Sequence, residues 1–191
     1  MAKKLLFKVN DMLVYPGQGV GKVTEISNKE IDGQTIQYYV VFLSEMDMTV
    51  LIPTDRAEER GLRSIASKKN AEAALKFLSE EPDALPSDWK ARYQLNTDLF
   101  KSGKILDVCS VIRALYHRGK VKELPIQEKK LYENSYKIFQ DEIVVALKID
   151  SQEAEMRIHK ALEPFPQNEK ANSSSDSLDD DIFEDDDEFD D

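Results

Sequence analysis

The chain of 191 residues contains one cysteine, two histidines and one tryptophan. A lone cysteine, Cys109, excludes an internal disulfide framework. Neither His117 nor His159 stands at a metal-ligand spacing from that cysteine. The longest uninterrupted apolar run covers residues 38–43, far too short to cross a bilayer. The first residues also lack the apolar core of a signal peptide, so these absences favour a cytoplasmic protein without a metal site.

Catalytic and nucleotide-binding patterns are missing as well. Residues 17–22, GQGVGK, approach a phosphate-binding loop, but Val23 stands where Ser or Thr is required and the next segment reads as a strand. Tight turns are the favoured interpretation of these glycines. No nucleophile, base and orienting group form a recognisable set, and Cys109 falls in an apolar helical stripe. The sequence therefore predicts a protein that is not an enzyme and needs no cofactor.

Charge is distributed unevenly along the chain, whose formal net charge is −11. Residues 171–191 contain eleven Asp or Glu and no Lys or Arg, and the rest of the chain has 26 basic and 26 acidic side chains. Within that neutral body, residues 86–137 hold 11 basic and 6 acidic side chains. This local excess of +5 suits a modest contact with nucleic acid, although tight binding would need a second anchor.

The first 55 residues have the pattern of a β domain. Short apolar or alternating segments are separated by turn residues, and Asp32-Gly33 is a strong hairpin signal because a type I′ turn needs positive φ at both central residues. The expected strands are residues 12–15, 22–26, the segment up to Ile31, 36–43 and 48–52. Four or five short strands joined by tight turns predict a small curled sheet or barrel.

The pattern becomes helical after the strands. N-cap residues, helix-terminating glycines and prolines divide this part of the chain into five segments. The expected helices run from Ser67 to Leu78, from Ser87 or Asp88 to Lys101, from Ile105 to near Gly119, from Pro125 through Val145, and from Ser151 to Leu162, with Pro164 and Pro166 terminating the last.

The predicted fold class is therefore α+β with separate domains. A small β domain over residues 1–58 is followed by a linker at residues 59–66, an all-helical domain at residues 67–166 and an acidic tail at residues 167–191. The tail has too few apolar side chains to offset its chain entropy, so we expect it to be disordered.

The single tryptophan, Trp89, lies at the N-terminal tip of the second expected helix, among Lys90, Arg92 and Tyr93. At 100° per residue it is offset from Leu95 and the rest of the expected buried face. Two interpretations stay open. Trp89 caps the helical core or packs on the β domain, or it is exposed and contacts nucleic acid. Weaker candidates for the same footprint are Arg113, Arg118, Lys120, Lys122, Lys129 and Lys130.

In the order and spacing of its motifs, the chain resembles the CarD/CdnL family of bacterial transcription regulators. The resemblance runs from about Phe7 to Leu162. Its motifs are residues 7–16, Gly19, Gly33, residues 48–53, Trp89 with Arg92-Tyr93, Ser102-Gly103, residues 111–115 and residues 127–130.

The resemblance implies a Tudor-like N-terminal domain that binds the β subunit of RNA polymerase, and a helical domain that touches promoter DNA without strong sequence specificity. Trp89 matches a tryptophan that wedges into the minor groove at the upstream edge of the transcription bubble. Lys90 and Arg92 would contact phosphates, and Tyr93 would support the wedge or make a minor contact. Lys129 matches a lysine near the DNA backbone. A monomer associated with the nucleoid through polymerase is expected.

For polymerase binding, the resemblance implies that an edge of the β subunit pairs with one strand of the N-terminal domain. That strand comprises Met48, Thr49, Val50, Leu51 and Ile52, and Lys29 matches a basic contact in the preceding hairpin. Leu51 stands where some family members have arginine, which changes one charged contact to an apolar one.

Two alternatives accompany this interpretation. The chain could instead be a protein–protein adaptor whose helical domain does not engage DNA, in which case Trp89 should be buried rather than largely exposed. The acidic tail, a further departure from the family, could compete with DNA for the basic face, although a role in solubility or in binding another partner is favoured.

Overall fold

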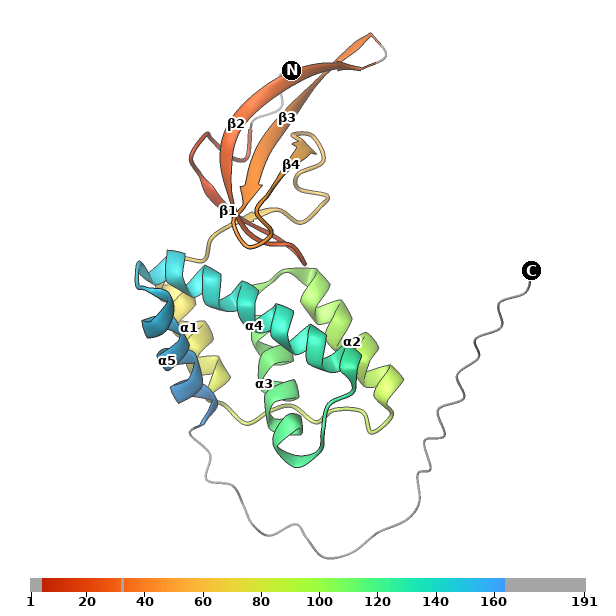
Figure 1. Cartoon of the computed structure of the whole chain (residues 1–191), viewed down its shortest axis with the longest axis vertical. Coiled ribbons are helices and arrows are strands. Elements are labelled where there is room, and N and C mark those ends of the chain that lie inside the picture. Colours follow the sequence, from red (N-terminus) through yellow and green to blue (C-terminus); the bar gives the residue numbers. More distant parts are fainter. Residues whose placement is uncertain (1–4, 32, 164–191) are drawn as a thin grey trace, which may run out of the picture.

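The computed structural model describes residues 5–31 and 33–163 of the chain (Figure 1). Its first part is one antiparallel sheet with strand order β4-β3-β2-β1-β5. Its strands are β1 (Met12–Tyr15), β2 (Gly19–Ile31), β3 (Gln34–Leu43), β4 (Met48–Pro53) and β5 (Arg63–Ser64). The expected strands are all present, and the two segments expected between residue 22 and Ile31 form the single strand β2. β5 is an additional strand.

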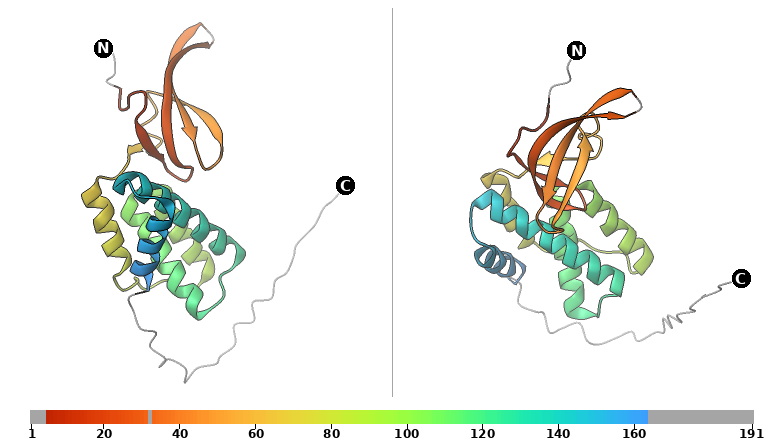
Figure 2. Two further views of the ribbon diagram at one scale, coloured as in Figure 1. Left: turned by 60° about the vertical axis from the view of Figure 1, so that its left-hand side comes forward. Right: turned by 45° about the horizontal axis from the view of Figure 1, so that its top comes forward.

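The sheet curls because β2 is long and irregular. Its register with β3 shifts between Val23 and Glu25, which is a bulge that bends a strand. Gly21 sits where the curled strands approach most closely, since a Cβ there would lie 2.6 Å from Val41 Cγ1. The outer part of the β2–β3 hairpin projects beyond the rest of the sheet (Figure 2).

The concave side of the sheet encloses its own apolar core. Leu13, Val41, Leu43 and Ile52 are almost completely buried. Tyr39 is buried too, and its hydroxyl accepts hydrogen bonds from the backbone N–H groups of Leu6 and Phe7, which ties the N-terminal segment onto the sheet.

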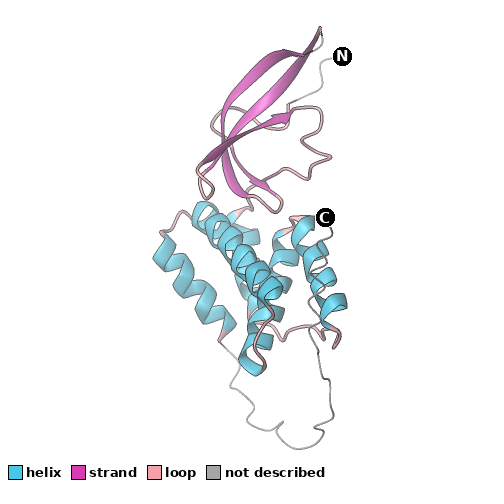
Figure 3. Cartoon of the chain, turned by 45° about the vertical axis from the view of Figure 1, so that its right-hand side comes forward, coloured by secondary structure: helices cyan, strands magenta, loops and turns pink. Residues whose placement is uncertain are grey.

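The second part is entirely helical and is segregated from the strands (Figure 3). Ser67 caps the first helix as expected, Asp88 rather than Ser87 caps the second, and Asp150 rather than Ser151 caps the last. The helices are α1 (Lys68–Leu78), α2 (Trp89–Ser102), α3 (Ile105–Val121), α4 (Ile126–Leu147) and α5 (Ser151–Leu162). The predicted α+β class, with a β domain followed by a helical one, is confirmed.

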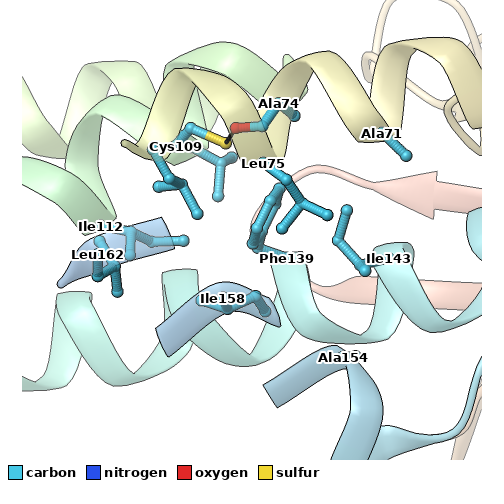
Figure 4. Packing of buried hydrophobic residues seen from close by; sticks show 12 residues of the cluster. Ala71, Ala74, Leu75, Cys109, Ile112, Phe139, Ile143, Ala154, Ile158 and Leu162 are labelled. Carbon is cyan, nitrogen blue, oxygen red and sulfur yellow. Dashed lines mark hydrogen bonds between the residues drawn. The ribbon is translucent and has the colours of Figure 1, made fainter. Parts of the chain in front are cut away.

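The main helical core lies between α1, α3, α4 and α5 (Figure 4). Small residues of α1, including Ala71 and Ala74, allow close approach, while Ile112, Phe139 and Ile158 fill the centre from the other three helices. α2 is largely outside this core and packs through a smaller cluster around Val111, Leu115 and Leu131.

An arginine at the end of the sheet connects the two domains. Arg63 of β5 pairs with Glu142 of α4 through two contacts of 2.5 and 2.8 Å, and its Nε donates to the carbonyl of Gly103 at 2.7 Å. Glu142 also accepts from the backbone N–H of Ala66. Gly103 ends α2 at φ 69°, and a Cβ there would lie 2.5 Å from Pro16, so glycine is required at this contact.

This connection corrects the predicted linker at residues 59–66. Arg63 and Ser64 pair with Val14 and Leu13 of β1, so the segment is built into the sheet and does not act as a free tether. The predicted tail at residues 167–191, with the terminating Pro164 and Pro166, lies outside the described residues.

The burial of Cys109 leads to a chemical prediction. Its side chain is inaccessible, its Sγ lies 3.7 Å from the Ala74 carbonyl, and burial raises the pKa of the thiol far above its ordinary value. We expect native Cys109 to react with a disulfide reagent at least about 1,000-fold more slowly than in the unfolded chain, because reaction requires opening of the helical core. Absorbance-monitored labelling with and without denaturant measures this ratio, and rapid labelling of the native protein would contradict it.

Candidate nucleic-acid interface

The first turns of α2 and α4 are joined by a buried ion pair. Arg92 of α2 and Glu128 of α4 are both completely buried. Nε and Nη2 of the arginine donate to the two carboxylate oxygens at 2.7 and 3.1 Å, and Nη1 donates to the carbonyls of Pro86 and Ser87 at 3.1 and 3.0 Å. One guanidinium thus holds the loop before α2, α2 itself and α4 at one end of the helical domain.

This geometry corrects the expectation that Arg92 contacts a DNA phosphate. The side chain is inaccessible, and a phosphate would have to displace Glu128 and leave a carboxylate buried without its partner, which is costly. Sequence spacing could not reveal this, because Glu128 is 36 residues away in the chain. Arg92 is a structural residue that positions its neighbours.

Trp89 is the first residue of α2, directly after the capping residue Asp88. The Asp88 carboxylate accepts from the Ala91 N–H at 2.8 Å, which fixes where the helix begins. Trp89 is partly exposed, between the buried side chain expected of an adaptor and the largely exposed one expected of a wedge. Lys90 Nζ lies 5.9 Å from the centre of the indole ring.

Tyr93 is one turn further along α2 and is also partly buried. It packs against the small apolar cluster formed by Val111, Leu115 and Leu131. Its ring is thereby held between α2 and the neighbouring helices, behind the tip that carries Trp89.

Cationic side chains surround this tip. Lys90 is exposed in the first turn of α2, and Lys129 and Lys130 are exposed at the start of α4. Lys122 is exposed in the connection from α3. Within residues 5–31 and 33–163, none of these four lysines forms an ion pair. Their ammonium groups are free to meet an anionic partner.

Two of the weaker basic candidates are occupied instead. Arg113 is buried, pairs with Asp83 at 3.0 Å and covers the Phe77 ring. Lys120 pairs with Glu163 at 2.9 Å. The pKa of Glu163 lies below its ordinary value because the Tyr116 hydroxyl donates to it and Lys120 does likewise. These side chains stabilise the helical domain rather than enlarge the cationic surface.

In the sheet, β4 pairs with β3 alone among the described strands and is therefore an edge. The Thr54 N–H donates to the Gln37 carbonyl, and hydrogen-bonded pairs alternate along an antiparallel ladder. It follows that Val50 and Ile52 bond to β3, whereas the backbone groups of Thr49 and Leu51 point to the open edge.

The predicted polymerase contacts differ in accessibility. Met48 and Leu51 are 44% and 41% exposed, and Thr49 is exposed as well. Ile52, the last residue of the predicted polymerase-binding strand, is only 1% exposed, and its side chain belongs to the sheet core. Lys29, exposed, pairs with Ile36 on the part of the hairpin that extends past β4.

Comparisons with known proteins cover both domains. The family model described as the CarD-like/TRCF RID domain matches residues 7–66, and the model described as the CarD C-terminal domain matches residues 73–159. YdeB of Bacillus subtilis (strain 168), named as a candidate transcription factor, is 35% identical over 146 residues, which cover 73% of this chain and 92% of YdeB. The chain belongs to the CarD family. It is thus a member of a transcription-factor family, as the sequence resemblance indicated.

A solved structure is also similar to part of this CarD-family chain. The solution NMR structure of the 72-residue N-terminal domain of Myxococcus xanthus CarD is 32% identical, with a TM-score of 0.28. The match covers 33% of this chain and 84% of that one. The N-terminal family model covers the whole of the predicted linker at residues 59–66, including β5, and the C-terminal model begins at residue 73.

Neither a metal-binding cluster nor a membrane-spanning helix is present among the described residues. No group of three or more His, Cys, Asp or Glu side chains there could hold a metal ion. No helix within residues 5–31 and 33–163 is long and apolar enough to cross a membrane.

Sequence reasoning missed one residue at the tip. Ile126 is the first residue of α4 and is 71% exposed, next to the lysines of that helix. A sequence signal for it exists, because Ile126 lies about 140° around the helix axis from the buried Leu131. Helical periodicity does not show how far a first-turn side chain projects from the helix.

The buried ion pair predicts a large loss of stability from one substitution. Arg92→Ala should lower the free energy of unfolding by about 3–5 kcal/mol, because Glu128 is left buried without its partner. Lys90→Ala, its exposed neighbour, should change it by less than about 0.5 kcal/mol. Urea unfolding followed by circular dichroism measures both.

A double variant tests whether the loss of stability in Arg92→Ala comes from the unpaired charge of Glu128. Arg92→Met with Glu128→Leu removes both buried charges and should recover most of the loss. An Arg92→Ala protein as stable as the wild type would show that the guanidinium does not hold the tip.

Proposed function

We propose that this protein is a non-enzymatic transcription regulator that binds RNA polymerase through the edge of β4 and stabilises the open promoter complex through Trp89. The observation that carries the proposal is the partly exposed indole, held at a helix tip by a buried ion pair and surrounded by unpaired lysines. Membership of the CarD family supports the same assignment.

The proposed mechanism is selective binding to opened DNA. Separating a base step costs a few kcal/mol, and an inserted apolar side chain offsets part of this cost only where the step is already open. Trp89 would therefore bind the melted upstream edge better than the closed duplex and shift the equilibrium toward the open state. Lys90 and Lys129 would neutralise nearby phosphates, and Tyr93 would support the indole from behind.

The second half of the proposal is the polymerase anchor. β4 offers outward N–H and C=O groups at Thr49 and Leu51, which is the arrangement needed to add a strand from a partner. A strand of the polymerase β subunit is the proposed partner, with Lys29 as a charged contact beyond the end of β4. The N-terminal match to a CarD-like/TRCF RID domain supports polymerase as the partner.

Both contacts are needed because each is weak. Four unpaired lysines give only a salt-sensitive, sequence-independent attraction to DNA. Attachment to polymerase would make the encounter with promoter DNA intramolecular and raise the effective concentration of the tip. This dependence also explains why a recognition helix for bases is not required.

Trp89→Ala tests the wedge. We expect wild-type protein to lengthen the lifetime of open complexes on a weak promoter, and Trp89→Ala to reduce this extension by about tenfold, because the variant cannot offset the cost of the separated step. The measurement is the decay of heparin-resistant complexes formed with cognate polymerase.

Thermal unfolding distinguishes the wedge from an adaptor. A wedge residue can be truncated with little change in stability, whereas a packed tryptophan costs about 3–5 kcal/mol. If Trp89→Ala unfolds early, or if wild-type protein has no effect on the lifetime, the adaptor becomes the better assignment.

Leu51→Pro tests the strand edge. Leu51 directs its N–H away from β3, so proline removes an outward donor without breaking a β3–β4 hydrogen bond. We expect binding to a purified polymerase β fragment to weaken at least about tenfold, as measured by biolayer interferometry.

The matched control is Leu51→Ala, which keeps the N–H and loses the side chain. Alanine should weaken binding much less than proline if backbone pairing dominates. Equal losses in two well-folded variants would show that the side chain, rather than the strand edge, makes the contact.

A further inference from the structure

We infer that Ile126 is a second apolar contact to the promoter minor groove, one base step or sugar away from the site of Trp89. The inference rests on the proposed function and extends it to a residue on a different helix. No feature of the sequence pattern had singled out this side chain.

The first argument is position. Trp89 and Ile126 are each the first residue of a helix, α2 and α4 respectively. The guanidinium of Arg92 touches both Ser87, two residues before Trp89, and Glu128, two residues after Ile126. The two helix starts therefore lie side by side at one end of the helical domain (Figures 1 and 2).

The second argument is direction. Cα–Cβ bonds in a helix tilt toward its N-terminus, so side chains at the first position project past the end of the helix. Ile126 is accordingly 71% exposed. Val121 is even more exposed, at 88%, but it ends α3, where the same tilt turns its side chain back along its own helix. Of these two residues, only Ile126 projects past the N-terminal end of its helix, as Trp89 does.

The third argument is charge, which selects the occupant. Lys129 and Lys130 are the fourth and fifth residues of α4 and have no ion pair among the described residues. Glu128 in the first turn of this helix is neutralised by Arg92, and the remaining acidic groups nearby are the capping Asp88 and Glu123. An exposed apolar group near free ammonium groups matches DNA, whose apolar sugar and base surfaces lie between phosphates.

Together these features make a contact at two points. A single inserted side chain can pivot, whereas two apolar groups on separate rigid helices define an orientation on the groove. Isoleucine is among the side chains used as minor-groove wedges, and the unstacked step beside Trp89 is the one most accessible to it. Ile126 would thus resist closure of the bubble together with Trp89.

The test compares Ile126→Ser with a matched control in the full chain. We expect Ile126→Ser to shorten the lifetime of wild-type-stabilised open complexes about fivefold, because part of an isoleucine side chain is no longer buried on DNA. Met156→Ser, an apolar residue of α5 that is 65% exposed, should leave the lifetime unchanged. Unfolding midpoints for both variants should stay at the wild-type value.

Ile126→Lys separates an apolar contact from a charged one. An added cation should restore the lifetime if only phosphates lie at this point, and it should not if Ile126 packs on sugar or base, so restoration would overturn the inference. An unchanged lifetime with Ile126→Ser, while Trp89→Ala still loses it, would overturn the inference and leave the proposed function intact. If wild-type protein does not stabilise the complex at all, both fail.

Discussion

The buried pairing of Arg92 with Glu128 is the interaction on which the rest of the tip depends. It places an ionised pair where neither partner meets water, a costly arrangement that is sustained because Glu128 and the Pro86 and Ser87 carbonyls accept the arginine's hydrogen bonds. A well-packed apolar pair would stabilise the fold as well. What the ion pair adds is direction, because a guanidinium fixes the angles at which three segments meet.

That constraint reaches the β domain through α2. The helix has 14 residues, which corresponds to about 21 Å. It begins at Trp89 and is capped at its C-terminus by Gly103, whose carbonyl accepts from Arg63 of β5. The same arginine holds Glu142 of α4. Both helices that form the tip are therefore attached, at or near their other ends, to one residue of the sheet.

Much of this fold could be predicted from the sequence because its signals are local. Caps, glycines and apolar periodicity predict the strands and helices to within a few residues, and the cap of the last helix is Asp150 rather than the expected Ser151. The failures were all non-local. The sequence predicts Arg92 as a surface cation because Glu128, its buried partner, is distant along the chain. It predicts residues 63–64 as a linker because β5 is so short.

These non-local contacts bear directly on how such a protein would act. If the domains were joined by a flexible linker, attachment of β4 would only raise the local concentration of the tip. Arg63 bridges β5, the end of α2, and α4. The position of the sheet therefore fixes the positions of Trp89 and Ile126, apart from small movements between the packed helices. Under the proposed function, the entropy cost of ordering the tip would be met during folding rather than on the promoter. A tip with few lysines would then act without strong DNA affinity of its own.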